Sequence, residues 1–316
     1  MSDILIIVSL IGGLILLFVG AEGLVRGSSA IALRLGISPL VIGLTVVAFG
    51  TSAPELLVSV KSSLEGNSDI AIGNVIGSNI CNIALILGVS ALINPMIVKA
   101  QVVKREIPIM IGVTVLLILM LLNNNISRLE GIILTAGIII YTVISIYLSK
   151  KERDPEVILE FQEELGKKPV GLLISSILVV VGLALLIFGA NIFVNGAVSA
   201  AERMGVSNAV IGLTVVAFGT SLPELITSIV AGIKKEGDIA IGNIVGSNVF
   251  NILSILGITA VIKPITSYGI SYVDLSIMLL TAVIILPLSY SGFKINRWEG
   301  AFLFIGYIAY FIYLLP

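Results

Sequence analysis

The stretch Val41–Glu55, VIGLTVVAFGTSAPE, decides the fold because it returns almost unchanged at Val210–Glu224 as VIGLTVVAFGTSLPE. The separation of 169 residues holds without a gap from residue 41 to residue 95, and 33 of these 55 positions match their counterparts. The matches include glycines, prolines and a glutamate, which chance similarity between two apolar helices would not keep in register. The chain is therefore an internal duplication.

The composition is that of a membrane protein. Of the 316 residues, 57% are hydrophobic and 12% are charged, and the mean hydropathy is +1.15. Soluble domains carry about 25% charged residues. A membrane-spanning helix needs about 20 mostly apolar residues. Ten such segments are expected, at about 4–25, 38–62, 70–93, 107–123, 128–148, 170–196, 208–233, 238–262, 272–290 and 298–315.

The composition also excludes several functions. A net charge of −1 gives no basic surface for nucleic acid. The sequence has no histidine, which argues against zinc chemistry and histidine proton relays. No pair of nucleophile and base stands out, so we expect neither an enzyme nor a cofactor. Cys81 is the single cysteine, which rules out an intrachain disulfide and favours a packing role.

The number of spans predicts the topology. Each half holds five spans, an odd number, so the second half enters the membrane from the opposite side. With this arrangement 14 of the 18 Lys and Arg residues fall on one side, which is therefore cytoplasmic. We expect an all-α plasma-membrane protein of ten transmembrane helices in two inverted five-helix repeats, with both termini extracellular. The repeats are 1–149 and 170–316, and a solvated cytoplasmic linker, 150–169, joins them.

The repeated motif should break its helix. Pro54 lacks an N–H group and its ring clashes with the carbonyl of Gly50, so the helix kinks or unwinds there. Pro223 does the same in the second half. In hydrocarbon an unsatisfied carbonyl costs several kcal/mol, so carbonyls freed at a break line a cavity or bind a ligand.

Oxygen-bearing side chains gather around these breaks. Thr51 and Ser52 share a helix face with Glu55, because they precede it by four and three residues. Ionisable residues inside a membrane are functional by default, whereas serine and asparagine can also serve helix packing. The candidate side-chain ligands are Thr51, Ser52, Glu55, Ser78, Asn82, Thr220, Ser221, Glu224, Ser247 and Asn251.

This set suits hard cations. Ca²⁺ accepts six to eight oxygens in flexible geometry, and two carboxylates neutralise one Ca²⁺. Without a cation, buried carboxylates take up protons. The sequence therefore indicates Ca²⁺ and Na⁺, with H⁺ as a further candidate. Three other acidic residues have milder interpretations: Glu22 is expected to be a structural anchor, and Asp69 and Asp238 are expected to be helix caps or dipole partners before ion-attracting mouth residues.

The paired motifs GTSAPE with GNVIGSNICN and GTSLPE with GNIVGSNVFN resemble the two α-repeats of the cation/calcium exchanger superfamily, in its prokaryotic sodium/calcium exchanger branch. They cover about 38–95 and 207–264. The resemblance implies a Na⁺/Ca²⁺ antiporter that works by alternating access, in which the first and sixth helices slide against a core with interrupted helices 2, 3, 7 and 8. It also implies the carbonyls of Ala48 and Ala217 as further ligands, and an electrogenic exchange of three Na⁺ for one Ca²⁺. Asparagine rather than aspartate at Asn251 resembles the K⁺-independent exchangers.

Alternatives remain open at this point. A Ca²⁺/H⁺ exchanger or a K⁺-dependent Na⁺/Ca²⁺ exchanger would use the same fold and glutamates. A cation channel could also use glutamate rings, but it would conduct without a counter-ion. The expected partners are Ca²⁺, Na⁺ and the lipid bilayer, and the expected state is a monomer.

Overall fold

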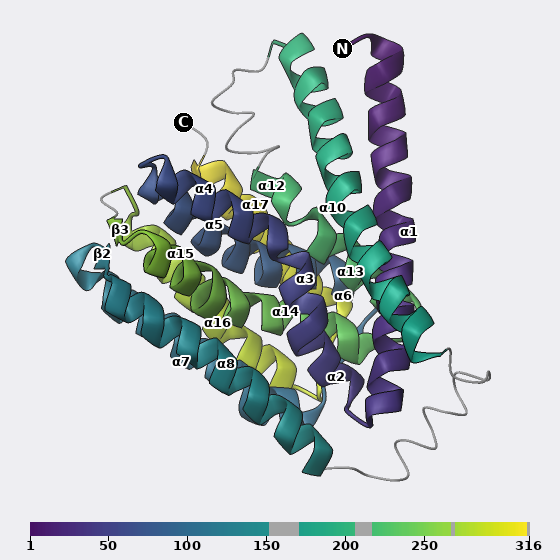
Figure 1. Ribbon diagram of the computed structural model, residues 1–316, viewed down its shortest axis with the longest axis vertical. Helices are drawn as coiled ribbons and strands as arrows, with labels where there is room; N and C mark the ends of the chain where they lie inside the picture. The colour runs from purple at the N-terminus through teal and green to yellow at the C-terminus, as the bar shows by residue number, and fades with distance from the viewer. Residues whose placement is uncertain (152–170, 206–216, 267–268, 315–316) are drawn as a thin grey trace.

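A computed structural model describes residues 1–151, 171–205, 217–266 and 269–314, and these residues are almost entirely helical (Figure 1). The first half contains α1 (Asp3–Leu35), α2 (Pro39–Ile42), η1 (Gly43–Val47), α3 (Ala48–Thr51), α4 (Ala53–Leu64), α5 (Ser68–Ile80), η2 (Cys81–Leu87), α6 (Gly88–Ile93), η3 (Val102–Glu106), α7 (Ile107–Met120), η4 (Leu121–Asn123) and α8 (Arg128–Lys151). The second half contains α10 (Leu172–Arg203), α12 (Ala217–Thr220), α13 (Leu222–Ile233), α14 (Gly237–Phe250), η6 (Asn251–Leu256), α15 (Gly257–Ile262), α16 (Tyr272–Tyr290) and α17 (Arg297–Leu314).

Much of this helical structure is apolar enough to cross a membrane. Within the described ranges, seven helices qualify by length and composition, or eight if the bent pair Pro39–Thr51 and Ala53–Leu64 counts as one span. The chain is thus a multi-pass membrane protein. The predicted span 208–233 is described only from residue 217 onward, and the predicted linker 150–169 lies outside the described residues except for its first two positions.

Two helices run further than the apolar pattern predicts. α1 continues to Leu35 rather than residue 25, and α10 continues to Arg203 rather than residue 196. Charged and hydroxyl residues end an apolar run but do not break a helix. α1 stops at Gly36, whose φ of 60° lies in the left-handed region that closes a helix. Apolar length therefore measures the part of the helix in hydrocarbon and not the whole helix.

α1 and α10 lie side by side over their length and form one pair (Figure 1). Glycines permit their close approach. A Cβ atom on Gly20 would lie 2.7 Å from the carbonyl oxygen of Gly182, so the two backbones meet without side chains between them. Stripes of small residues at helix interfaces commonly allow such packing in membranes.

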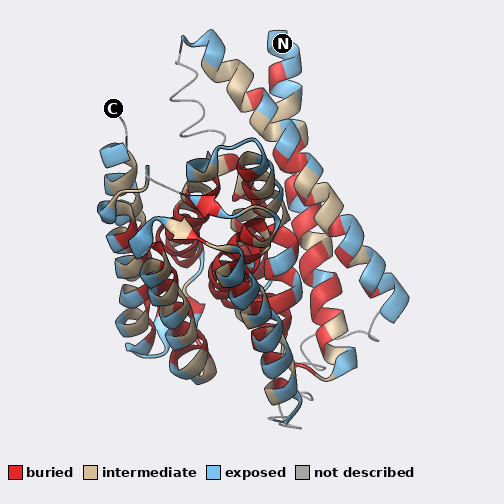
Figure 2. Cartoon of the chain, turned by 60° about the vertical axis from the view of Figure 1, so that its left-hand side comes forward, coloured by how far each residue is buried: buried red, intermediate tan, exposed pale blue. Residues whose placement is uncertain are grey.

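The core lies around α5 and α14. Every residue from Ile239 to Phe250 is buried, and Figure 2 shows the buried residues concentrated in the central helices, with exposed faces on the outer ones. α14 packs closely on α2 and η1, because a Cβ atom on Gly242 would lie 2.6 Å from the carbonyl oxygen of Leu40 in α2 and 2.9 Å from the backbone nitrogen of Leu44 in η1. A hydrophobic helix that is buried on all sides is a core element and not a lipid-facing one.

The predicted helix break is present. Ser52 separates α3 from α4, and the two parts of this span are bent by 45°. Ser221 separates α12 from α13 at the equivalent position. In the predicted spans 70–93 and 238–262, the expected interruption takes the form of π-helical stretches, η2 and η6, rather than a gap. These stretches lack proline, so the helix absorbs the irregularity without losing a donor.

Four short strands join the two halves. β1 (Met96–Ile97) pairs antiparallel with β4 (Lys294–Ile295), and β2 (Asn125–Ile126) pairs antiparallel with β3 (Ile265–Thr266). The repeat separation of 169 residues relates β1 to β3 and β2 to β4. The two strand pairs are therefore equivalent, and each contains one strand from each half.

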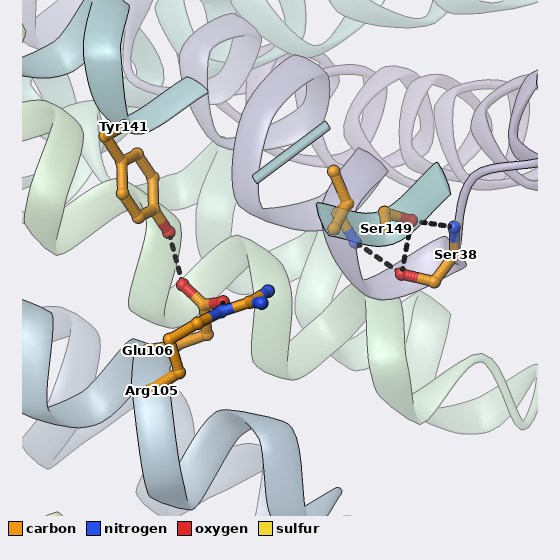
Figure 3. A network of polar contacts seen from close by, with 6 residues as sticks. Ser38, Arg105, Glu106, Tyr141 and Ser149 are labelled. Atoms are coloured by element: carbon orange, nitrogen blue, oxygen red, sulfur yellow. Dashed lines mark hydrogen bonds and ion pairs between the residues drawn. The ribbon is translucent and has the colours of Figure 1, made fainter. Parts of the chain in front are cut away.

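A buried carboxylate outside the repeated motifs has a structural role. Glu106 accepts a hydrogen bond of 2.9 Å from the Tyr141 hydroxyl, and its other oxygen lies 2.7 Å from Nε of Arg105 (Figure 3). Tyr310, the repeat counterpart of Tyr141, likewise donates to Asp274 at 2.9 Å. Since Glu106 is paired with an adjacent guanidinium, its charge is compensated within the protein.

Candidate cation site

Two buried glutamates begin the helices that follow the breaks. Glu55 lies in the first turn of α4 and is 1% exposed, and Glu224 lies in the first turn of α13 and is 2% exposed. The proline before each glutamate occupies the first turn, where its missing N–H group costs no helical hydrogen bond. The N-terminus of a helix also favours negative charge.

The two breaks face each other. The Ser52 hydroxyl donates to Oε1 of Glu224 at 3.0 Å, and the Ser221 hydroxyl donates to Oε1 of Glu55 at 3.3 Å. The sequence predicted that each serine shares a helix face with the glutamate of its own half, but these two hydrogen bonds run between the halves. The structure thus brings these four predicted residues together in one reciprocal arrangement.

Several oxygens in this region are buried without a partner. Within the described residues, hydrogen bonds are lacking at Oε2 of Glu55, Oε2 of Glu224, Oδ1 of Asn82, Oδ1 of Asn251 and Oγ of Ser247. Leaving a buried polar group unsatisfied costs about 1–3 kcal/mol, and more for a charged group. Four of the five can only accept, so a cation is the partner that would satisfy them together.

The remaining predicted ligands are also placed. Ser78 is buried, and Thr220 is half-buried at the end of α12, which begins at Ala217. Thr51 donates to Oδ1 of Asn243 at 3.1 Å. The Ala48 carbonyl already accepts a helical hydrogen bond from the backbone N–H of Ser52 at 3.0 Å, and the Thr51 hydroxyl lies 3.4 Å from it, so the helix break does not leave this carbonyl free.

Three asparagines contact the site although the sequence argument did not select them. Asn74 Nδ2 donates to the backbone carbonyl of Glu55 at 3.2 Å, and Asn243 Nδ2 donates to that of Glu224 at 3.4 Å. Asn79 accepts a hydrogen bond of 2.9 Å from the side chain of Asn251. The available signal was their identity in both repeats, within DIAIGN and GSN.

Three acidic residues pair elsewhere. Glu22 lies 2.7 Å from Nζ of Lys234, in agreement with a structural anchor. Asp238 lies 2.6 Å from Nζ of Lys99. Asp69 accepts a hydrogen bond from a backbone N–H of the other half, that of Gly269. Asp69 and Asp238 occupy the first turns of α5 and α14, where they suit the helix dipole, but the cap positions belong to Asn67 and Glu236.

The charge of the site is low. In the part of the chain that the structure describes, no group of three or more His, Cys, Asp or Glu side chains is arranged to hold a metal. The site offers two carboxylates, and the other candidate ligands are neutral oxygens. Such a set matches one divalent or a few monovalent hard cations and does not match the soft-ligand sites of zinc or copper.

Comparison with known proteins agrees with this geometry. The family described as sodium/calcium exchanger protein matches residues 5–147 and 174–315. The putative antiporter CaxA of Alkalimonas amylolytica is 41% identical over 94% of this chain and 95% of its own, and the sodium/calcium exchanger MaX1 of Methanosarcina acetivorans is 34% identical over 96% of each. A solved structure of the sodium-calcium exchanger NCX_Mj superposes over 100% of both chains with a TM-score of 0.85 and 34% identity. The chain belongs to the sodium/calcium exchanger family.

Proposed function

We propose that this protein is a secondary active antiporter that exchanges Na⁺ for Ca²⁺ across the plasma membrane by alternating access. The observation that carries the proposal is the set of buried, unpartnered oxygens supplied by both repeats around Glu55 and Glu224. The names of MaX1 and NCX_Mj as sodium/calcium exchangers support the choice of ions.

Ca²⁺ binds between the two carboxylates, and the Na⁺ sites lie around it. Two carboxylates neutralise one Ca²⁺, and hydroxyl, amide and carbonyl oxygens complete its shell. The proposed ligands are Glu55, Glu224, Thr51, Thr220, Ser52, Ser221, Ser78, Ser247, Asn82 and Asn251, with the carbonyls of Ala48 and Ala217.

The chain crosses the membrane ten times, as two inverted five-helix repeats, 1–149 and 170–316. The two equivalent strand pairs support this arrangement: inverted repeats require the β1–β4 pair and the β2–β3 pair to lie at opposite faces. Lys99 follows β1 and Lys294 lies in β4, so the β1–β4 face is the cytoplasmic one. Both termini are then extracellular, and the linker 150–169 is cytoplasmic.

Unequal packing of the two repeats supports alternating access. Phe218, Leu222 and Leu85 line a cavity of about 390 Å³. Their counterparts Phe49, Ala53 and Ser254 line a cavity of only about 10 Å³. In the closed cavity, the ring of Phe49 packs on that of Phe250 with centroids 5.8 Å apart. The repeat places the smaller Cys81 at the position of Phe250.

The pair α1–α10 also contacts the two repeats unequally. α1 packs along α13, and the Glu22–Lys234 ion pair joins them. The equivalent helices, α10 and α4, lack comparable packing in the described parts of the chain. Two similar halves that pack differently are what one state of a two-state carrier requires. If the packing of the first half were adopted by the second half, and the reverse, the carrier would be in its other state.

The exchange is electrogenic, with three Na⁺ per Ca²⁺, and K⁺-independent, and the protein works as a monomer. The proposal that exchange does not need K⁺ rests on Asn251, whose side chain adds no charge to the cage, that is, to the set of proposed oxygen ligands around Glu55 and Glu224.

The test is uptake of ⁴⁵Ca²⁺ into proteoliposomes preloaded with Na⁺ or with choline. Na⁺ loading should drive uptake, and choline loading should give none. Equal uptake from choline-loaded vesicles would indicate a channel. Uptake driven by a proton gradient without Na⁺ would indicate a Ca²⁺/H⁺ exchanger, and a requirement for added K⁺ would indicate a K⁺-dependent one. Each of these three results contradicts the proposal.

A further inference from the structure

The fully buried side chain of Asn243 connects three parts of the site. Its Nδ2 donates to the backbone carbonyl of Glu224 at 3.4 Å and to Oγ of Ser228 at 3.0 Å. Its Oδ1 accepts a hydrogen bond of 3.1 Å from the Thr51 hydroxyl, which belongs to the other repeat. Asn243 itself lies on α14, so one amide ties α14 to α13 and to α3.

Asn74 makes two equivalent contacts in the first repeat. Its Nδ2 donates to the carbonyl of Glu55 at 3.2 Å and to Oγ of Ser59 at 3.0 Å. A carbonyl oxygen can only accept, so the amide atom that faces it must be the nitrogen. The orientation of both asparagines is therefore fixed by their surroundings.

The amide of Asn243 differs from the amides proposed as ligands. Asn82 and Asn251 each keep an unpartnered, buried Oδ1 within the described structure. In Asn243, by contrast, the nitrogen donates twice and the oxygen accepts from Thr51. Asn243 therefore has its hydrogen-bonding groups engaged by protein and is suited to hold other residues rather than a cation.

We propose that Asn243 and Asn74 are positioning residues that set the cation affinity of the exchange site. The inference rests on the proposed function, because it assumes that Glu55, Glu224 and Thr51 bind the ions. Each asparagine holds the backbone carbonyl of a glutamate in the first turn after a helix break. Because the backbone of the glutamate is held, the direction in which its carboxylate points into the cage is also set.

Asn243 has a second effect, on Thr51. A hydroxyl has one proton and two lone pairs, and a proton that points at a cation opposes binding. Oδ1 of Asn243 lies 3.1 Å from the Thr51 hydroxyl and is nearer than its other acceptor, the Ala48 carbonyl at 3.4 Å. The proton therefore points at Asn243, and the lone pairs of Thr51 are free to face the cage. The action of Asn243 on affinity thus passes partly through Thr51.

Removing residues that orient metal ligands commonly lowers metal affinity about 10- to 100-fold. We expect a loss in this range for Asn243→Ala and for Asn74→Ala. The matched control is Asn94→Ala, because Asn94 Nδ2 donates to the carbonyl of Gly232 at 2.8 Å, at the opposite end of α13. This control removes the same kind of hydrogen bond to the same helix without touching the site.

The experiment is equilibrium binding of ⁴⁵Ca²⁺ to the purified full-length protein without Na⁺, followed by displacement with Na⁺. The binding curve gives the number of Ca²⁺ sites per protein and the dissociation constant separately. A variant that only folds poorly has fewer sites but the same dissociation constant, whereas a loss of positioning raises the dissociation constant. If Asn243 acts partly through Thr51, the double variant Thr51→Val with Asn243→Ala should bind Ca²⁺ more tightly than the product of the two single losses predicts.

The outcomes separate the two proposals. If the wild-type protein binds no Ca²⁺ that Na⁺ displaces, the proposed function fails and this inference fails with it. If the wild-type protein binds and Asn243→Ala retains its affinity, only the inference is overturned. Independent, multiplicative losses in the double variant would overturn the role of Asn243 through Thr51. If Asn243→Ala does not fold, Asn74→Ala at the less buried equivalent position decides the question.

Discussion

The Ser52 hydroxyl lies 3.0 Å from Oε1 of Glu224, although 172 residues separate the two along the chain. Ser221 and Glu55 repeat this relationship at 3.3 Å. Each carboxylate is therefore held by a serine from the opposite repeat. A shift of one repeat against the other must change both contacts, so the geometry of the cage is coupled to the arrangement of the two halves.

The reciprocal serines should matter for affinity. Ser52→Ala or Ser221→Ala removes a hydrogen bond to a charged group, which is worth about 1.5–3 kcal/mol. We expect each change to raise the Ca²⁺ concentration for half-maximal Na⁺-driven uptake by about tenfold or more, since about 1.4 kcal/mol corresponds to a factor of ten. Ser149→Ala is the control, because Ser149 accepts a hydrogen bond from the backbone of Ser38 away from the site. An equal effect in the control would contradict a specific role.

The glutamates should be indispensable. Glu55→Gln or Glu224→Gln keeps the size of the side chain and leaves Ca²⁺ with half of its compensating charge in a buried site. We expect Na⁺-driven ⁴⁵Ca²⁺ uptake to be abolished while the protein still inserts and folds. Glu65→Gln serves as the control, because Glu65 is exposed and faces Lys61 at 3.9 Å. Near-normal uptake by either buried variant would remove the basis of the proposed site.

Much of the site could be predicted from the sequence. Helix periodicity alone places Thr51, Ser52 and Glu55 on one face, and the repeat doubles the set. The contacts of Ser52 with Glu224 and of Thr51 with Asn243 could not be predicted in this way. They depend on how two breaks oppose each other across the core, which no local spacing encodes.

The positioning asparagines and the helix ends were also not predictable from local sequence patterns. Asn243 directly follows Gly242 in the repeated motif, but its spacing from Glu224 and Thr51 along the chain does not indicate that it contacts them. Its role becomes visible only with the three partners around it. The extension of α1 to Leu35 was missed because hydropathy reports the solvent around a helix and not its hydrogen bonds.

The strand pairs predict topology in a form that can be tested. Ile97 of β1 and Asn124 next to β2 are both exposed. In a Cys81→Ser background, cysteine at position 97 should react with an impermeant thiol reagent only after the cytoplasmic face is opened. Cysteine at position 124 should react in intact cells. Labelling of both positions from the same side would contradict the inverted repeats.

The Glu22–Lys234 ion pair should bias the carrier toward the state described here. It joins α1 to the end of α13, and the repeat places Asn191 and Glu65 at the equivalent positions, which cannot form an ion pair. Partly exposed pairs contribute about 0.2–1 kcal/mol, so Glu22→Gln should shift the balance of states by a factor of about five at most. Exchange of the two charges, Glu22→Lys with Lys234→Glu, should restore it.

The measurement for this shift is the reactivity of a cysteine placed at Leu222, which lines the larger cavity, in the Cys81→Ser background. Glu22→Gln should slow its modification by a reagent added from outside, because the cavity closes more often. The Lys61–Glu65 pair, 3.9 Å apart within one exposed helix end, provides the control, and Glu65→Gln should leave the rate unchanged. An unchanged rate in Glu22→Gln would show that this ion pair does not influence the balance.

Exchange should depend on the membrane potential. The cage carries two negative charges, from Glu55 and Glu224, and Asn82 and Asn251 add none. One Ca²⁺ makes it neutral, whereas three Na⁺ leave one positive charge that the field acts on. One elementary charge is worth about 2.3 kcal/mol per 100 mV, which is enough to change flux strongly. An inside-negative potential should therefore assist Na⁺ entry and Ca²⁺ exit. The measurement is ⁴⁵Ca²⁺ efflux from proteoliposomes clamped at several potentials with K⁺ and valinomycin, and efflux that ignores the potential would indicate two Na⁺ per Ca²⁺ rather than three.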